Sequence, residues 1–451
     1  MQMYGRGDKM ACILFSPLGD TDPVRGCYDG AMLHILRHYR PIRIVLFYTH
    51  DMAEKEHSDH RYTRAIRRTA PDCVIEEIVT DIREAHLYES FSRLLPQAIQ
   101  KLREENPDKE ILINLSSGTP QMKTVLAMLA ADTENCVGIQ VSAPARTSNR
   151  ANEATQDAED IDALLENNFD EEERAENRCE EPPLGVFRYY AERSRILSLI
   201  ETYEYAAALK IARRSPLVPQ AAVTLLTHTA KRSALCTEEA KAVLREYEGK
   251  KLFPLSGRAE TLVEYFLIIQ MDQETGRLSN LMLRMIPFLY EFLRDYVEQN
   301  VLSLRELSER RSGAPCLVRE KLAERAPNLL TYLDREFSRG YTEQPLSFYI
   351  LYHVCVYAEE QGLAKNRELH TALMAELVKI RRVRELRNSV AHEVMNVTEE
   401  LFHAKMGIGS HEAVSAFARM LTLVYGEKVR PLRSLYRDLN TWTCKALEIH
   451  A

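Results

Sequence analysis

One short stretch near the end of the sequence combines residue types that can cleave RNA without a metal. It reads RNSVAH and begins at Arg387. A histidine such as His392 titrates near neutral pH and can move protons to or from the 2′-hydroxyl and the leaving oxygen, while an arginine can stabilise a phosphorane-like transition state. Asn388 and His392 are four apart and share one helical face, whereas Arg387 and His392 point about 140° apart. A complete site would therefore combine two copies of the helix across a dimer axis.

The segment that carries this stretch is expected to be a helix with one apolar and one basic face. Residues that recur at three- and four-residue steps form the apolar face: Leu373, Leu377, Ile380, Val383, Leu386 and Val390. The basic face carries Arg381, Arg382, Arg384 and Arg387. This pattern predicts a packed helix. It fits an RNA-cleaving helix, and it fits equally a basic surface helix whose histidine is structural.

A second group of candidate residues follows an apolar run that begins at Glu110. The run leads into Ser116, Ser117, Gly118, Thr119 and Pro120, with Lys123 one turn further on. Thr119 can cap a helix that starts at Pro120, and a helix N-terminus attracts anions through its unpaired N–H groups. Gly118 permits close approach of a ligand, and Lys123 adds a full charge. The same residues also suit a well-capped turn that binds nothing.

A polar loop after the first apolar run supports the interpretation as a ligand site. It contains Gly19, Asp20, Thr21 and Asp22. In a doubly wound sheet the first and fourth strands lie side by side, so the two loops are expected to converge. Asp20 and Asp22 could accept hydrogen bonds from a ribose or base, or could simply form a turn. Neither loop has a dinucleotide or P-loop glycine pattern. A loop at 81–86 is a weaker candidate.

The elements around these loops predict a Rossmann-like α/β domain. Five short apolar runs begin at Ala11, Ile42, Cys73, Glu110 and Val137. They alternate with segments long enough for crossover helices, which is typical of a parallel sheet buried on both faces. From about Leu184 onward the apolar spacing is helical and no strand is evident. We therefore expect an α/β domain over 1–150, a linker over 151–183 and an all-α domain over 184–451.

The expected linker is strongly acidic. Residues 151–181 contain thirteen acidic residues and two arginines, whereas the whole chain of 451 residues has a formal net charge of −7. The rest of the chain is therefore mildly basic. Such a segment is typically a solvated linker, although it could also mimic a nucleic acid.

Cysteine usage and hydropathy indicate a cytoplasmic protein. The nine cysteines form no CxxC pair, which suits a reducing compartment better than a disulfide framework or a zinc site. The sequence contains neither an apolar run long enough for a membrane helix nor a signal-peptide pattern at its beginning. No tight group of Asp, Glu and His has metal-ligand spacing, so we expect no metal and no cofactor.

The segments SPLGDTDP and NLSSGTPQMK resemble the CARF domain of CRISPR-associated ribonucleases of type III systems. The resemblance implies a homodimer that binds a cyclic oligoadenylate activator, with the hexa-adenylate preferred over the tetra-adenylate. It places Asp20, Thr21, Asp22, Ser116, Ser117, Gly118, Thr119 and Lys123 at the ligand. Some relatives also cleave the bound ring, and Asp22 and Thr119 would be the residues to test for that activity.

The stretch RNSVAH is similar to the signature of HEPN ribonucleases. That resemblance implies metal-independent cleavage of single-stranded RNA, with 2′,3′-cyclic phosphate products and no stable association with the interference complex. His392 would be the general acid or base, Arg387 the transition-state stabiliser and Asn388 a positioning residue. CARF followed by HEPN is the order found in the type III-A accessory ribonucleases. The alternatives are a regulator without catalysis, a free-standing RNase toxin, and, with less support, a metal-dependent nuclease.

Overall fold

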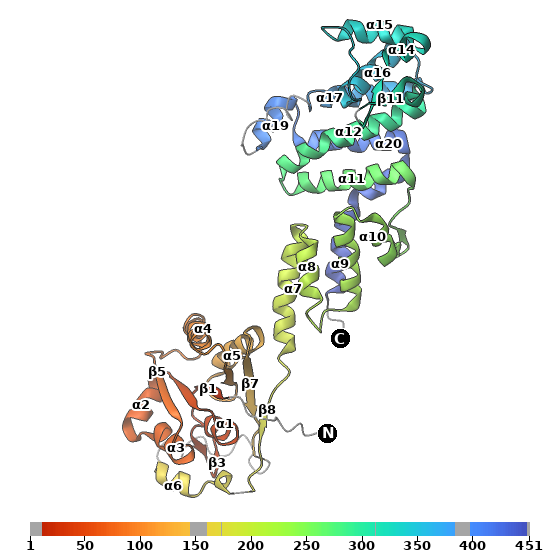
Figure 1. Cartoon of the computed structure of the whole chain (residues 1–451). Coiled ribbons are helices and arrows are strands. Elements are labelled where there is room, and N and C mark those ends of the chain that lie inside the picture. Colours follow the sequence, from red (N-terminus) through yellow and green to blue (C-terminus); the bar gives the residue numbers. More distant parts are fainter. Residues whose placement is uncertain (1–10, 145–159, 173, 312, 384–396, 449–451) are drawn as a thin grey trace. The chain divides into compact units, whose positions relative to one another are not determined.

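The structure is a computed structural model that describes residues 11–144, 160–172, 174–311, 313–383 and 397–448 (Figure 1). It divides into an α/β unit, Met1–Glu192, and a helical unit, Arg193–Ala451. The predicted order of an α/β domain followed by an all-helical one is confirmed.

The α/β unit is built on a six-stranded sheet with the order β5-β4-β1-β6-β7-β8. The strands are β1 (Cys12–Pro17), β4 (Arg43–Tyr48), β5 (Val74–Val79), β6 (Glu110–Asn114), β7 (Cys136–Val141) and β8 (Cys179–Glu180). The first five are parallel, and β8 runs antiparallel to β7. All five apolar runs therefore form strands as predicted. β1 pairs with both β4 and β6, so the first and fourth runs are neighbours, as expected.

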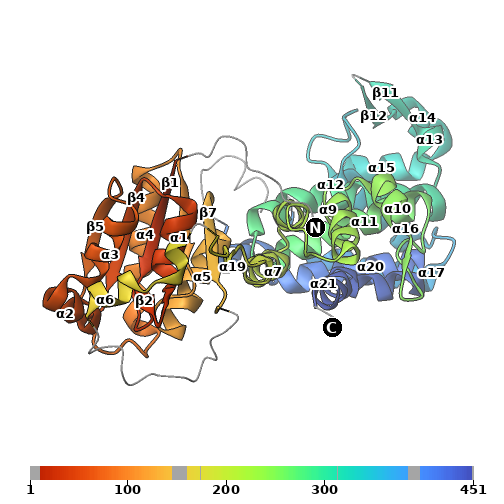
Figure 2. The ribbon, with the colours of Figure 1, turned by 90° about the horizontal axis from the view of Figure 1, so that it is seen from below.

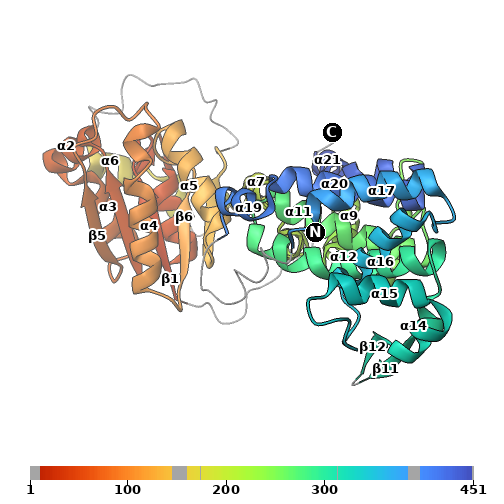
Figure 3. The same ribbon diagram turned by 90° about the horizontal axis from the view of Figure 1, so that it is seen from above.

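Helices cover both faces of this sheet (Figures 2 and 3). One face is covered by α1 (Ala31–Tyr39), α2 (His50–Asp59), α3 (Arg61–Thr69) and α6 (Ile161–Glu166). The other face is covered by η1 (Glu89–Phe91), α4 (Leu94–Glu105) and α5 (Pro120–Asp132). Successive side chains of β1 point to opposite faces of the sheet. Leu14 packs in the core beneath α1, α2, α3 and α6, and Phe15 packs in the core beneath η1, α4 and α5. This packing fixes the carboxyl ends of β1 and β6, where the candidate loops begin.

Two features of the α/β unit differ from the sequence-based expectation. The strand β5 lies at the sheet edge rather than being buried on both faces, and Val74 and Val79 are exposed. The acidic segment is not simply a solvated linker, because residues 160–180 pack into this unit. Ile161 and Leu165 enter the core, and β8 extends the sheet. Apolar residues among the carboxylates contribute to the docking, since burial of their side chains is favourable.

The helical unit is centred on four helices that pack against one another. They are α11 (Gly257–Glu274), α12 (Leu278–Asn300), α17 (Arg367–Ile380) and α20 (Ser410–Tyr425). Phe288 of α12 and Phe417 of α20 lie with ring centroids 4.9 Å apart. The helix α7 (Gly185–Glu201) spans the boundary between the two units, and α8 (Tyr205–Ala212), α9 (Gln220–Ser233) and α10 (Thr237–Val243) follow it. The apolar run from Ile196 to Ala212 is divided into α7 and α8, because Tyr203 adopts a left-handed conformation with φ of +61°.

The remaining helical elements lie around these helices. They are α13 (Leu304–Leu307), α14 (Arg319–Arg325), α15 (Pro327–Glu336), α16 (Phe348–Gln361), α19 (Glu399–Met406), η4 (Glu427–Ser434) and α21 (Leu435–Ala446). The helical unit also contains two short hairpins that apolar spacing did not indicate: β9 (Glu246–Tyr247) with β10 (Lys250–Lys251), and β11 (Ser308–Arg311) with β12 (Ala314–Leu317). The first turns through Glu248 and Gly249, both at positive φ. Within the part of the chain that the structure describes, no helix combines the length and apolarity needed to cross a membrane.

Candidate functional site

The loop between β6 and α5 has the geometry that its sequence predicts. Thr119 is the N-cap of α5, and its hydroxyl oxygen accepts a hydrogen bond from the Met122 N–H at 3.4 Å. Pro120 is the first residue of the helix. Gly118 has a φ of +81°, a conformation that favours glycine. The N-terminus of a thirteen-residue helix therefore points its free N–H groups toward the carboxyl edge of the sheet.

Asn114, the last residue of β6, ties this loop to the end of β1. Its side chain is fully buried and donates to the hydroxyls of Ser16, at 2.9 Å, and Ser117, at 2.8 Å. Its side-chain oxygen Oδ1 accepts the N–H groups of Ser116 and Ser117. Sequence reasoning missed this residue. A polar residue at the end of an otherwise apolar strand is the signal that could have revealed it, since buried amides need partners.

Asp22 anchors the loop after β1. Its carboxylate is buried and accepts the N–H groups of Gly19 and Met32, each at 3.1 Å. Burial raises the pKa of Asp22 to about 6, although the hydrogen bond with Ser117 and the charge of Lys123 act in the opposite direction. Burial also lowers the pKa of Lys123, which is half-buried. A carboxyl that titrates near neutral pH can exchange a proton with a ligand, and the lysine beside it can bind an anionic ligand through its charge.

The two loops approach each other closely. A Cβ atom built on Gly19 would lie 2.7 Å from the Gly118 nitrogen, so a side chain at Gly19 would push the loops apart. The structure thus brings together four of the predicted residues: Asp22, Ser117, Gly118 and Lys123. We call Asp22, Asn114, Ser117 and Lys123 the pocket cluster.

Four other predicted residues lie at the same edge with different partners. Asp20 is largely exposed and pairs with Lys55 of α2 at 2.9 Å. The Ser116 hydroxyl accepts the Val141 N–H of β7 at 2.8 Å. Thr119 caps α5, and Thr21 is half-buried between Asp20 and Asp22. In the weaker third loop, Asp81 lies 3.2 Å from His50, and His86 is exposed.

The proposed catalytic residues Arg387, Asn388 and His392 lie outside the described residues. The structure describes the segment before them, where α17 ends at Ile380. Four members of the predicted apolar face are fully buried: Leu373, Leu377, Ile380 and Val383. Arg381 and Arg382 are exposed, as the basic face requires. The pattern is therefore confirmed as far as Val383.

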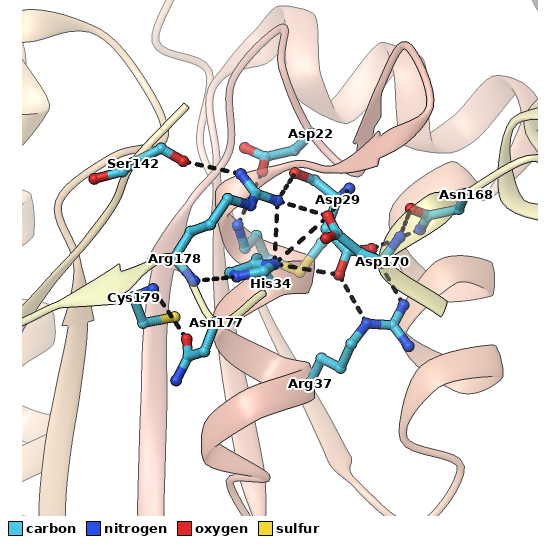
Figure 4. Close-up of polar contacts among 11 residues, drawn as sticks. Asp22, Asp29, His34, Arg37, Ser142, Asn168, Asp170, Asn177, Arg178 and Cys179 are labelled. Carbon is cyan, nitrogen blue, oxygen red and sulfur yellow. Dashed lines mark hydrogen bonds and ion pairs between the residues drawn. The ribbon is translucent and has the colours of Figure 1, made fainter. Parts of the chain in front are cut away.

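A second buried polar cluster was not apparent from the sequence. It consists of three buried residues, Asp29, His34 and Asp170, and two partly buried arginines, Arg37 and Arg178, and we call it the connector cluster (Figure 4). Arg37 donates two hydrogen bonds to Asp29, at 2.8 and 3.1 Å, and Arg178 donates to Asp170 at 2.6 Å. Burial alone would raise the carboxyl pKa values, but hydrogen bonds with His34, together with the two arginines, hold the pKa of Asp29 and of Asp170 below the ordinary value.

Three members of the connector cluster also have the spacing of metal ligands. One donor atom from each of Asp29, His34 and Asp170 lies within 4.8 Å of the others. The sequence-based prediction that no group of acidic residues and histidine has metal-ligand spacing is therefore wrong. The fold brings together residues that are far apart along the chain. The Arg178 guanidinium already contacts Asp170 and lies 3.2 Å from His34 Nδ1. A permanent cation at this position favours a salt-bridge cluster over a metal site.

Comparison with protein families matches three consecutive segments of this chain. The Cas_Csm6 CARF domain matches residues 72–179, the Csm6 6H domain residues 182–233 and the Cas_Csm6 HEPN domain residues 252–442. The CARF match extends to residue 179 and so covers most of the acidic segment, which the sequence predicts to be a linker over 151–183. The 6H match covers helices that we expected to be part of the HEPN domain.

Curated relatives and a solved structure agree with these matches. The CRISPR system endoribonuclease Csm6 of Mycobacterium tuberculosis is 38% identical over 210 residues, 46% of this chain and about half, 51%, of that protein. The Csm6 of Enterococcus italicus is 26% identical over 92% of this chain and 95% of its own length.

The structure of Enterococcus italicus Csm6 bound to cyclic hexa-2′-fluoro-hexa-dAMP superimposes with a TM-score of 0.69. It covers 97% of this chain and 100% of that one at 23% identity, which is a likeness of fold. The ordered CARF, 6H and HEPN matches, carried by a sheet and helical unit of the corresponding fold, show that the chain belongs to the Csm6 family of CRISPR-associated proteins.

Proposed function

We propose that this chain is a cytoplasmic endoribonuclease of CRISPR antiviral defence that cuts single-stranded RNA when a cyclic oligoadenylate occupies the α/β unit. The observation that carries the proposal is that the match to the Csm6 HEPN domain, 252–442, spans the stretch from Arg387 to His392. A histidine and an arginine supply proton transfer and charge stabilisation, so the reaction needs neither a metal nor a cofactor. The expected products carry a 2′,3′-cyclic phosphate.

The ligand half of the proposal is supported by the pocket cluster. A helix N-terminus, Lys123 and a buried carboxyl face the carboxyl edge of the sheet, where open α/β sheets bind ligands. A homodimer would place two such edges around a ring with internal symmetry, and would pair two copies of His392. We favour the hexa-adenylate because the relative in the solved complex is bound to a cyclic hexanucleotide, cyclic hexa-2′-fluoro-hexa-dAMP. Cleavage of that ring by Asp22 and Thr119 is a further part of this hypothesis.

The decisive experiment measures cleavage of a fluorescent single-stranded RNA in EDTA, with cyclic tetra-adenylate, cyclic hexa-adenylate or neither. We expect strong cleavage with the hexa-adenylate only, reduced at least ~100-fold by His392→Ala. His403→Ala is the matched control, since this exposed histidine of α19 lies eleven residues further on. Unchanged activity of His392→Ala would refute the catalytic assignment and favour a regulator. Full cleavage without a ring would favour a free-standing toxin, and loss in EDTA a metal-dependent nuclease.

The pocket assignment has its own test. Lys123→Ala and Thr119→Ala should weaken binding of the ring, measured by calorimetry, while Lys101→Ala on the exposed face of α4 should not. Activation of both pocket variants at the same ring concentration as the unaltered protein would show that the ring binds elsewhere.

A further inference from the structure

Buried polar contacts join the pocket loop to the segment that leads into the helical unit. The first link is at the N-terminus of α1. Asp22 accepts the Met32 N–H, and the Gly30 N–H donates to the Pro23 carbonyl at 2.7 Å. A Cβ atom on Gly30 would lie 2.3 Å from the Thr21 carbonyl oxygen, so the loop and α1 are in direct contact. A movement of Asp22 must therefore be accommodated by α1.

The second link joins α1 to residues 168–180 (Figure 4). His34 of α1 accepts the main-chain N–H of Arg178 on Nε2 at 3.0 Å. Asp29, just before α1, accepts from Asn168 at 2.6 Å, and its own N–H donates to Asp170 at 2.7 Å. Asn168, Asp170 and Arg178 are thus held by directional bonds to α1 and to Asp29 just before it.

The third link joins the same segment to the sheet. The Arg178 guanidinium donates to the Ser142 carbonyl at 2.9 Å, and the Ser142 N–H donates to the Arg178 carbonyl at 3.0 Å. Val141 of β7 pairs with Cys179 of β8 and also donates to Ser116 in the pocket loop. Two series of contacts therefore connect the pocket cluster to Arg178, one through α1 and one through β7. Only a few residues separate β8 from α7, the helix that leads into the helical unit.

We propose that Arg178 is the residue through which ligand occupancy in the α/β unit reaches the helical unit. The inference rests on the proposed function and adds a regulatory residue to it. Two arrangements are involved, one with Arg178 bonded to His34 through its main-chain N–H and to Ser142 through its guanidinium, and one with these bonds broken. The ring shifts their populations to the extent that it prefers one position of Asp22 and the Ser116 loop.

The most informative variant is Arg178→Lys. It keeps the charge beside Asp170 but lacks the planar guanidinium, whose two terminal nitrogens bond Asp170 and Ser142 at the same time. We expect the variant to bind the ring within about twofold of the unaltered protein, with unchanged cleavage in its absence. Stimulation of RNA cleavage by the ring should fall about tenfold. Arg68→Lys is the matched control, because Arg68 also makes a two-bond contact with the acidic segment, at Glu171, but on the surface.

Ring binding by calorimetry and RNA cleavage are measured on the full chain. Normal stimulation of Arg178→Lys would overturn the inference and leave the proposed function intact. If the unaltered protein neither binds nor responds to either ring, the proposed function itself fails and the inference with it.

A measurement without any variant guards against a folding defect. Hydrogen exchange of the Arg178 amide should change at least about fivefold when the hexa-adenylate is added. Equal exchange with and without the ring, while ring-dependent cleavage is normal, would also overturn the inference.

Discussion

The two buried polar clusters of the α/β unit differ in composition and in how fully their groups are paired. The connector cluster holds two carboxylates, two guanidinium groups and one imidazole, and its charges pair with one another. The pocket cluster consists of two short neutral side chains, Asn114 and Ser117, together with one carboxyl of raised pKa and one lysine of lowered pKa. Paired charges stabilise the first cluster, whereas the second holds a carboxyl and a lysine whose shifted pKa values a bound ligand can restore toward the ordinary ones. Stability should therefore depend mostly on the connector cluster, and ligand affinity on the pocket cluster.

The largest expected effect is on stability. Asp170→Ala removes the partner of Arg178, whose side chain is only 8% exposed, and leaves a buried charge unpaired. We expect the free energy of unfolding of the α/β unit to fall by about 3–5 kcal/mol. Urea unfolding followed by circular dichroism measures it. The fluorescence of Trp442, the only tryptophan, reports the helical unit alone. An unchanged urea midpoint of the circular dichroism transition would show that the connector cluster adds little stability.

The next effect separates affinity from stability. Asn114→Ala leaves two hydroxyls and two N–H groups without their partner, which should cost about 2–3 kcal/mol and weaken ring binding at least about tenfold. Asn106→Ala is the matched control, since this buried asparagine donates to Leu102 before β6, away from the pocket. It should lose stability but keep ring affinity. Equal losses of affinity in both variants would indicate a general loosening of the sheet.

Much of the α/β unit could be predicted from its sequence because local patterns encode it. Five apolar runs became strands, and the residues from Ser116 to Pro120 formed the expected capped turn. The helix before Arg387 was indicated by its spacing as far as Val383. The connector cluster could not be predicted in this way, since Asp29 and Asp170 are 141 residues apart and meet only after the acidic segment docks. Because this docking depends on long-range contacts, the local composition of the segment predicts only a solvated linker.

A smaller effect is expected on the pH dependence of ring affinity. The pKa of Asp22 is raised from 3.8 to about 6. The folded state therefore binds this proton more tightly than the unfolded state, and stability due to it is lost as pH rises through about 6. The same carboxylate repels a phosphate, so affinity for the hexa-adenylate should increase roughly three- to tenfold between pH 7.5 and 5.5. Asp22→Asn should remove that dependence. An affinity that is independent of pH in the unaltered protein would place the ring away from Asp22.

The smallest effect on the free energy of unfolding is expected for Glu171, although it directly follows Asp170, whose replacement should have the largest. Glu171 pairs with Arg68 at 2.9 Å, but both side chains are well exposed. Water screens such a pair, so Glu171→Ala should change the free energy of unfolding by less than about 0.5 kcal/mol. Asp170→Ala and Glu171→Ala remove neighbouring carboxylates from the same segment, and each carboxylate pairs with an arginine. A difference of several kcal/mol between the two variants in the same urea titration would attribute the docking of residues 168–180 to buried charge. Similar losses would instead attribute it to the apolar anchors Ile161 and Leu165.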